Sequence, residues 1–272
     1  LRTNSTTAER TSTSGDITAF NSSGFSLGAS TTSGVNSSGN DYASWTFRKA
    51  PKFFDVLTYT GNGTSQTIAH NLGTTVGSIF VKCTTNTYDW AIYHRSLGGG
   101  YYLRTAPYGT DAAGATTQYW NNTDATSQSF TVGSNSATNY SGQTYVAYIF
   151  AHNDSGDGGF GPDGDADIIK CGSFTTPSSA ADTVINLGFE PQWLLVKSST
   201  MGSPWRIIDV MRGMPVDGGT TALYADQTYS ESTIGNGNNF FNLNPTGFTL
   251  TSTGHPHFGN NQTHIYIAIR RG

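Results

Sequence analysis

The sequence predicts an all-β protein made of tandem antiparallel β-sandwich domains of jelly-roll-like form. Charged residues make up only 12% of the chain, and its acidic residues are three glutamates against fifteen aspartates. Good helix formers are therefore scarce, whereas β-branched and aromatic residues are common. Short apolar or alternating runs are separated by Gly-Asn, Asn-Gly, Ser-Gly and Gly-Gly turn signals, and no run predicts a helix. Several short strands joined by turns are typical of sandwiches and jelly rolls.

An internal repeat of about 115 residues predicts the domain organisation. The run NLGTTVGSIFVKCTTNTYDWAIYH from Asn71 aligns without a gap to NLGFEPQWLLVKSSTMGSPWRIID from Asn186. Further on, SFTV aligns with GFTL, and YVAY from Tyr145 aligns with YIAI from Tyr266. The second half of the unit occurs once more near the start, where GFSL from Gly24 leads to SSGNDYASWTF. Copies of this length indicate tandem domains rather than solenoid turns.

This pattern predicts three domains. Residues 1–49 are the second half of a repeat whose preceding chain we expect to be missing, 50–160 the first complete sandwich and 161–272 the second. The predicted strands of the first complete copy are FDVLTYTG, GSIFVKCT, YDWAIYH, QSFTVG and TYVAYIFAH, and those of the second are QWLLVKS, PWRIIDV, GFTLT and HIYIAIRR. Because YVAYIF and IYIAI are apolar on both faces, they are predicted to be central strands.

Charge and cysteine content exclude several classes of protein. The net charge of −4 is mild, which argues against a nucleic-acid surface with clustered Lys and Arg. No run approaches the roughly 18 apolar residues of a membrane helix, so no membrane insertion is expected. Cys83 and Cys171 do not form a disulfide framework and are interpreted as half-buried free thiols on strands. Free thiols suit assembly in a reducing host cytoplasm.

No catalytic residue is assigned, and the chain is predicted not to be an enzyme. The Gly-x-Ser-x-Gly spacing occurs at Gly24–Gly28, but it overlaps GFSL, which the repeat aligns with the strand SFTV, so it does not predict the strand-to-helix turn of a nucleophile elbow. Asp89 and His94 are close in sequence but point to opposite faces of an alternating strand. Glycoside hydrolysis needs two carboxylates at a fixed separation, and the three glutamates are far apart and outside the repeated motifs.

An acidic, glycine-rich run, AHNDSGDGGFGPDGDAD, lies between the two complete copies. Asp163, Asp165 and Asp167 alternate, and such spacing can supply oxygen ligands to Ca²⁺ from one turn. An EF-hand counted from Asp163 fails, because Ile168 and Phe174 take the positions of its Gly and Glu. A looser calcium turn stays open as a hypothesis beside the favoured interpretation, a solvated linker. The junction RKAPKFFDV after Phe47 has the same position and no acidic run.

A second metal hypothesis concerns the run GHPHFGNNQTH. His255 and His257 are two residues apart, so on an extended segment their rings point the same way and can share a metal ion. The alternative is a surface loop before the last strand.

Two aromatic runs, GGGYYLRTAPYG and TTQYWNNTD, are candidates for exposed sugar-binding loops. Aromatic faces beside amide groups are typical of sugar platforms, although tandem sandwiches also need aromatic cores. The candidate glycan-binding residues are Tyr101, Tyr102, Tyr108, Tyr119 and Trp120.

The motifs FDVLTYTGNGTSQTIAHNLG, DWAIYHRSLG, YVAYIFAHN, NLGFEPQWLLVKSS and IYIAIRRG resemble a repeat domain found in structural proteins of tailed phages, especially marine ones. The resemblance covers nearly the whole chain from about Asp16, and it brings no catalytic residues. It implies a virion component: a tail fibre, another appendage or a protein of the capsid surface. The run PDGDAD is more acidic than the family pattern.

Together these observations predict a non-enzymatic structural protein of a bacteriophage virion, made in the host cytoplasm and displayed on the virion exterior. We expect it to form a homo-oligomer, with a trimer favoured, and to contact other virion proteins and a host glycan. No cofactor is expected apart from the hypothetical Ca²⁺. The alternatives are a carbohydrate-binding module of a larger glycan-active protein and a depolymerase-type enzyme.

Overall fold

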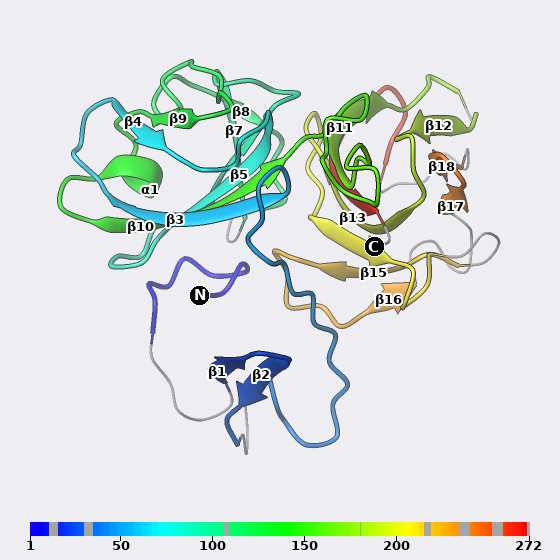
Figure 1. Ribbon diagram of the computed structural model, residues 1–272, viewed down its shortest axis with the longest axis horizontal. Coiled ribbons are helices and arrows are strands. Elements are labelled where there is room, and N and C mark those ends of the chain that lie inside the picture. Colours follow the sequence, from blue (N-terminus) through cyan, green and yellow to red (C-terminus); the bar gives the residue numbers. More distant parts are fainter. Residues whose placement is uncertain are drawn as a thin grey trace. The chain divides into compact units, whose positions relative to one another are not determined.

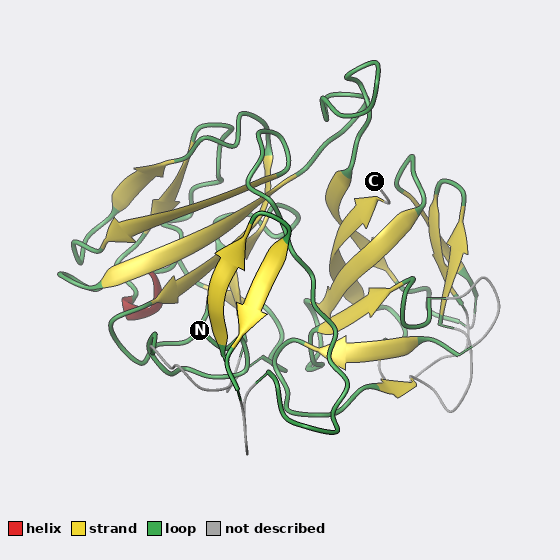
Figure 2. Ribbon diagram, turned by 60° about the horizontal axis from the view of Figure 1, so that its bottom comes forward, coloured by secondary structure: helices red, strands yellow, loops and turns green. Residues whose placement is uncertain are grey.

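The computed structural model confirms an all-β sandwich fold (Figures 1 and 2). It describes residues 1–10, 16–29, 35–105, 109–179, 181–214, 219–233, 240–251 and 258–270. The chain divides into a small unit, Glu9–Arg48 with Leu1, and a large unit made of Arg2–Ala8 and the described residues from Lys49 onward. The one helix in these ranges, α1 (Ser136–Asn139), is a single turn whose N-cap Asn135 accepts a hydrogen bond from the Ala137 amide.

The large unit begins with a structure that we call the first sandwich. Its main sheet contains, in spatial order, β3 (Phe54–Thr60), β10 (Thr144–Ala151), β5 (Val76–Cys83), β6 (Ala91–His94), β7 (Tyr101–Arg104) and β8 (Gly114–Ala115). Its smaller sheet pairs β4 (Gln66–Ala69) with β9 (Ser129–Val132).

The second sandwich follows along the chain. Its main sheet contains, in spatial order, β11 (Ile169–Thr175), β19 (Thr263–Arg270), β13 (Pro191–Ser198), β14 (Arg206–Asp209), β15 (Thr221–Tyr224) and β16 (Ser232–Thr233). Its smaller sheet contains β12 (Thr183–Asn186), β18 (Gly247–Leu250) and β17 (Phe241–Asn244).

The two main sheets have the same strand order and the same antiparallel pairing. In each, the strand that the sequence marks as apolar on both faces is central: β10 lies between β3 and β5, and β19 lies between β11 and β13. That prediction is confirmed. The internal repeat and the domain boundaries at residues 49 and 160 stay predictions.

Strand register corrects one alignment made from the sequence. Tyr145 lies opposite Tyr59 in the first sandwich, and His264 lies opposite Phe174 in the second. The rings stack alike, with centroids 5.2 Å apart for Tyr59 and Tyr145 and 5.1 Å apart for Phe174 and His264. His264, not Tyr266, therefore takes the place of Tyr145. The sequence alignment was wrong by two residues, a shift that keeps each side chain on the same face of its strand.

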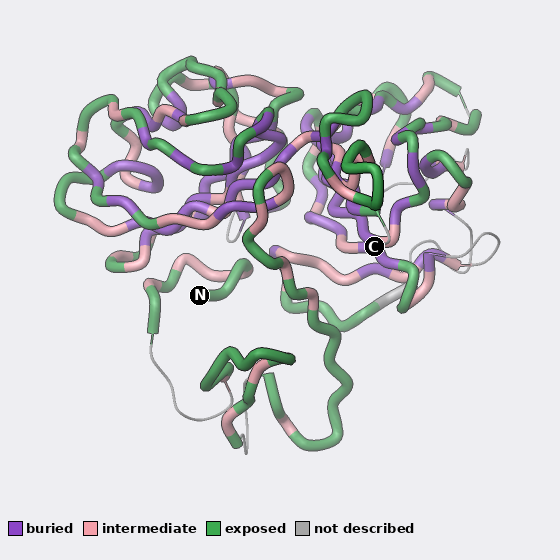
Figure 3. Tube along the Cα trace, viewed as in Figure 1, coloured by how far each residue is buried: buried purple, intermediate pink, exposed green. Residues whose placement is uncertain are grey.

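Each sandwich has an aromatic core between its two sheets. The ring of Tyr59 on β3 meets that of Phe130 on β9 edge-on with centroids 6.1 Å apart, and Phe174 on β11 meets Phe248 on β18 at the same distance. Buried residues follow the strands of the main sheets, as Figure 3 shows. Burial of these faces provides the main driving force for folding of the sheets.

The small unit is a hairpin with little core of its own. β1 (Ile17–Asn21) pairs with β2 (Gly24–Leu27), and every residue of β1 is exposed. From the turn to Ala19 the hairpin has the register of β17–β18, and it then shifts at a bulge before Ile17, so Phe25 takes the place of Phe248 and Leu27 that of Leu250. Phe248 and Leu250 are buried, whereas Leu27 is 37% exposed. A two-stranded hairpin of this kind is marginally stable alone.

Candidate docking site

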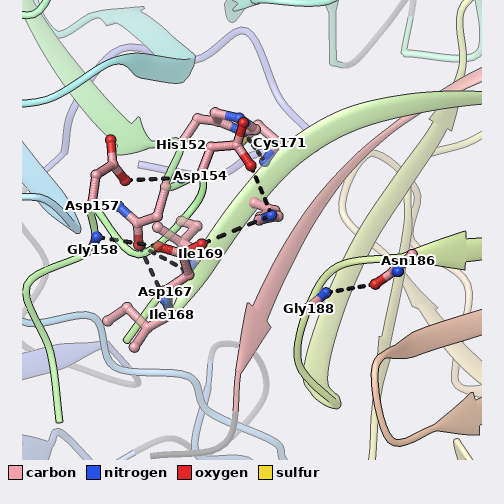
Figure 4. A network of polar contacts seen from close by, with 12 residues as sticks. His152, Asp154, Asp157, Gly158, Asp167, Ile168, Ile169, Cys171, Asn186 and Gly188 are labelled. Atoms are coloured by element: carbon pink, nitrogen blue, oxygen red, sulfur yellow. Dashed lines mark hydrogen bonds and ion pairs between the residues drawn. The ribbon is translucent and has the colours of Figure 1, made fainter. Parts of the chain in front are cut away.

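The acidic run between the sandwiches is held by its own hydrogen bonds (Figure 4). The Asn153 side chain is fully buried; its Oδ1 accepts from the Ile168 and Ile169 amides, and its Nδ2 donates to the Lys52 carbonyl at 2.8 Å. The Cys171 amide donates to Nδ1 of His152 at 3.2 Å. This junction is therefore a hydrogen-bonded connection between β10 and β11, and residues 154–157 and 161–165 are exposed, as expected of a solvated linker.

Of the three alternating aspartates of this run, Asp163 and Asp165 are exposed and Asp167 is half-buried. Asp167 accepts a hydrogen bond from the Gly158 amide at 3.2 Å and lies 3.8 Å from the Lys170 ammonium. No group of three or more His, Cys, Asp or Glu side chains is placed to hold a metal ion in the described part of the chain, which includes Asp163 and Asp165. The geometry thus lends the calcium hypothesis no support, and it stays a prediction.

The candidate glycan-binding aromatics divide between core and surface. Trp120 is 1% exposed and Tyr119 6%, so the expectation of an exposed loop is wrong for both. The Tyr102 ring stacks on that of Tyr119 with centroids 3.9 Å apart, which leaves Tyr101, at 45% exposed, as the open aromatic face. Tyr108 lies outside the described residues.

The histidine pair His255 and His257 also lies outside the described residues. His264 is buried, its Nε2 lies 2.9 Å from the Phe258 carbonyl, and burial lowers its pKa to about 4. Cys83 and Cys171 are fully buried free thiols, not half-buried ones. Burial raises the pKa of the Cys171 thiol, so the reactive thiolate is disfavoured.

Two pairs of side chains that the sequence analysis did not single out bind main-chain carbonyls of other segments. The first clamp consists of Lys82 on β5 and Trp90 just before β6. The Lys82 ammonium donates to the carbonyls of Thr6 at 3.1 Å and Cys83 at 2.9 Å. The Trp90 indole N–H donates to the Arg2 carbonyl at 2.9 Å. The first clamp thus holds the N-terminal segment Arg2–Ala8 against the first sandwich.

The second clamp consists of Lys197 on β13 and Trp205 just before β14. The Lys197 ammonium donates to the carbonyls of Asp111 and Ser203, each at 2.7 Å. The Trp205 indole N–H donates to the Arg104 carbonyl at 2.9 Å. Since Arg104 and Asp111 belong to the first sandwich, the second clamp joins the two sandwiches.

The two clamps correspond residue by residue. Lys82 and Lys197, like Trp90 and Trp205, are 115 positions apart. The segments that they hold also share sequence, because Leu-Arg-Thr occurs at residues 1–3 and again at residues 103–105. In both cases the indole binds the arginine carbonyl of this motif. The repeat alignment contained this signal, as the matched Val-Lys and Trp positions, but the matches predicted only strands.

Burial makes these cations electrostatically unusual. Lys82 and Lys197 are fully buried, and desolvation lowers the pKa of both ammonium groups, that of Lys197 to about 8. A buried cation is stabilised by oxygen acceptors, which the held segments supply as main-chain carbonyls. The arrangement can therefore bind an extended peptide segment with little dependence on its side chains.

Other polar contacts reinforce the join between the sandwiches. The His94 ring Nε2 lies 3.1 Å from the Tyr266 carbonyl, and the Ala113 amide donates to the Ser199 carbonyl at 2.9 Å. A Cβ placed on Gly77 would lie 2.4 Å from Sγ of Cys171, so the main chains of the sandwiches approach closely there.

The fold and the clamps define an all-β sandwich protein in which main-chain carbonyls join the two sandwiches and hold the segment Arg2–Ala8. The family model described as "Domain of unknown function (DUF7483)" matches residues 1–270, and the chain belongs to this family. No curated protein has a significant match to the sequence. No helix in the described residues is long and apolar enough to cross a membrane.

Two solved structures show a weak likeness. A chain from "Life in the extremes: atomic structure of Sulfolobus Turreted Icosahedral Virus" is 14% identical with a TM-score of 0.27, the match covering 80% of this chain and 89% of that one. A chain from "Crystal Structure of the STIV MCP" is 12% identical with a TM-score of 0.24, over 80% of this chain and 95% of that one. Likeness at these TM-scores carries no conclusion about this chain.

Proposed function

We propose that the chain is a non-enzymatic structural component of a bacteriophage virion, displayed on its exterior. The observation that carries this proposal is the pair of clamps, in which two buried lysines hold main-chain segments from elsewhere in the chain. A protein that builds itself by docking like units side by side suits an assembled particle. The resemblance of its motifs to tailed-phage structural repeats supports the same role.

In this role the partners are further copies of the chain and other virion proteins. We propose a homo-oligomer, with a trimer favoured because fibres and appendages commonly have threefold symmetry. Sedimentation equilibrium of the purified chain tests this point, and a monomer at every concentration would contradict it.

Particles of the phage that encodes the chain provide the test of the virion role. Mass spectrometry of purified particles should detect the chain at a fixed stoichiometry. Antibodies raised against it should decorate intact particles in electron micrographs. Absence from the particles would overturn the structural role, and labelling only after the capsid is opened would overturn the exterior placement.

A carbohydrate-binding module is the second candidate, and the exposed ring of Tyr101 favours it. A glycan array should then show binding that Tyr101→Ala removes. Tyr229→Ala is the matched control, because Tyr229 is 65% exposed and belongs to neither aromatic run of the sequence. Sugar binding that both variants retain would place the site elsewhere.

A further inference from the structure

We propose that the first clamp is also an intermolecular docking site. The segment Arg2–Ala8 of one copy enters the first clamp of a second copy in exchange for that copy's own segment, so that copies join head to tail. This inference deepens the structural role proposed above. Its test uses the isolated protein, so its outcome is independent of where the chain sits in a particle.

The second clamp shows that a site of this kind can join two folded bodies. There the segment held by Lys197 and Trp205 comes from the neighbouring sandwich and leads directly into its strands β7 and β8. The first clamp makes the matching contacts with Arg2 and Thr6. An intramolecular joint and a terminal segment are thus bound in the same way.

Recognition through carbonyls suits exchange between copies. A segment from a second copy offers Lys82 and Trp90 the same acceptors as the chain's own segment, so exchange leaves the buried cation satisfied. Exchange of an identical element is a low-cost route to association, because the contacts are the same in the closed and the exchanged forms. Each contact runs from the segment of one copy to the clamp of the next, so each copy can give one segment and accept another.

The chain between segment and clamp permits this exchange. Glu9–Arg48 forms a compact unit separate from the first sandwich, so the segment can leave without breaking a strand of the main sheets.

Exposed apolar surface on the small unit also favours an assembly. Phe20 is 79% exposed and Ile17 46%. In the second sandwich β18 pairs with β12 on one side and β17 on the other, whereas β2, its equivalent, pairs only with β1 among the described strands. Packing copies together would cover this surface and supply neighbours for the open edge of β2.

The contacts of each clamp are tested by matched full-length variants. Lys82→Met with Trp90→Phe removes the donors of the first clamp, and Lys197→Met with Trp205→Phe removes those of the second. Proteolytic cleavage should become about fivefold faster or more within residues 2–8 for the first variant and within residues 104–111 for the second, because a released segment is open to a protease. Unchanged cleavage within residues 2–8 of the first variant would overturn the role of the clamp.

Complementation tests docking between copies. The Lys82→Met, Trp90→Phe variant can give its segment but not accept one. A variant that lacks residues 1–8 has no carbonyls to offer, so it can accept a segment but not give one. In sedimentation velocity each variant alone should be monomeric, their mixture should form a one-to-one dimer, and the wild type should form larger species as concentration rises.

Two outcomes would overturn the proposal. If the mixture stays monomeric, the clamp does not accept a segment in trans. If either variant associates alone as well as the wild type does, association uses another surface. Neither outcome bears on whether the chain is found in virions, which the experiments on particles decide separately.

Discussion

The two clamps use the same pair of side chains, a lysine and a tryptophan, but the segments that they hold are connected differently to the rest of the fold. The second clamp holds a loop anchored at both ends in β7 and β8, so its contacts tie one sandwich to the other. The first clamp holds the segment Arg2–Ala8, which continues into the small unit rather than into a strand of either sandwich. The same chemistry therefore makes a permanent joint in one place and a releasable one in the other. The difference lies in chain connectivity, not in the bonds.

Trp205→Ala should have the largest effect. Trp205 is buried and its ring lies 5.9 Å from that of Phe80 in the first sandwich, so truncation removes packing between the sandwiches as well as the bond to Arg104. We expect a loss of about 3–5 kcal/mol in the free energy of unfolding. Denaturation followed by fluorescence and by circular dichroism should then show two transitions.

Trp90→Ala is the matched comparison. The Trp90 ring stacks on Tyr148 of its own sandwich, at 5.9 Å, so its truncation should destabilise the first sandwich without separating the two. A single transition for both variants would mean that the second clamp does not couple the sandwiches.

Acid should weaken the joint between the sandwiches next. His94 is buried, accepts the Ser96 amide at Nδ1 and lies 3.1 Å from the Tyr266 carbonyl through Nε2, so both nitrogens are used by the neutral ring. Burial lowers its pKa from 6.5 to about 4. Between these values the unfolded chain takes up a proton that the folded chain does not. Stability is therefore full above pH 6.5 and falls toward pH 4, by about 3 kcal/mol at 1.36 kcal/mol per unit.

The variant His94→Gln tests the assignment of this pH dependence. Its amide keeps a donor for the Tyr266 carbonyl and does not titrate. Thermal melts from pH 7 to pH 4 should show a flatter decline for the variant than for the wild type. Parallel curves would place the titrating group elsewhere, with His152 and His264, whose pKa values are also lowered to about 4 by burial, as the candidates.

Gly77→Ala should cost about 1–3 kcal/mol by overpacking. Its Cβ would meet Cys171 Sγ at 2.4 Å and the Ala151 carbonyl at 2.6 Å, at the contact between the sandwiches. The corresponding position of the second sandwich, 115 residues on, is Gln192, whose side chain is half-buried. Gly24→Ala is the control, because no heavy atom lies within 4 Å of its added Cβ. Equal melting temperatures for the two variants would contradict the close approach.

The sequence predicted the fold class because local signals agreed. Alternating runs, turn pairs and the scarcity of helix formers all indicated strands, and the apolar runs around Ala147 and Ile267 were correctly assigned to the centres of their sheets. The register of the strands was harder to predict from the sequence. A two-residue shift preserves the faces of a strand, so the pairing of Tyr145 with Tyr266 fitted the pattern as well as that with His264.

The candidate sites were harder to predict, because burial is set by tertiary packing. Tyr119 and Trp120 have the composition of an exposed loop, and the structure places them in the core. The clamps were missed for a related reason: their ligands are carbonyls, which every residue carries, so no motif marks the segment except the shared Leu-Arg-Thr. A lysine in a buried strand position was the available clue, since an unpaired lysine is rarely buried.

Asp154→Asn, at the junction, should have the smallest effect, and Asp55→Asn in the first sandwich is its comparison. Lys170, the partner of Asp154, takes the position of Asp55, 115 residues earlier, so the charge at this position is reversed between the sandwiches. Asp55 is 1% exposed and accepts from Lys49 at 2.6 Å and from the Asn71 amide at 2.8 Å. Burial tends to raise the pKa of Asp55, but these bonds hold it below its usual value. Asp55→Asn should therefore cost about 1.5–3 kcal/mol.

At Asp154 the carboxylate is 66% exposed and bonds to Lys170 at 3.1 Å, where water and salt compete for both charges. Asp154→Asn should consequently cost less than about 1 kcal/mol in a chemical denaturation series, and 0.5 M NaCl should shrink the difference further.

A chelator separates this ion pair from the calcium hypothesis at Asp163, Asp165 and Asp167. An ion pair alone leaves the melting temperature unchanged on chelation, whereas a bound Ca²⁺ lowers it by mass action. A drop on chelation that Asp167→Asn abolishes would show that the junction is a metal site after all.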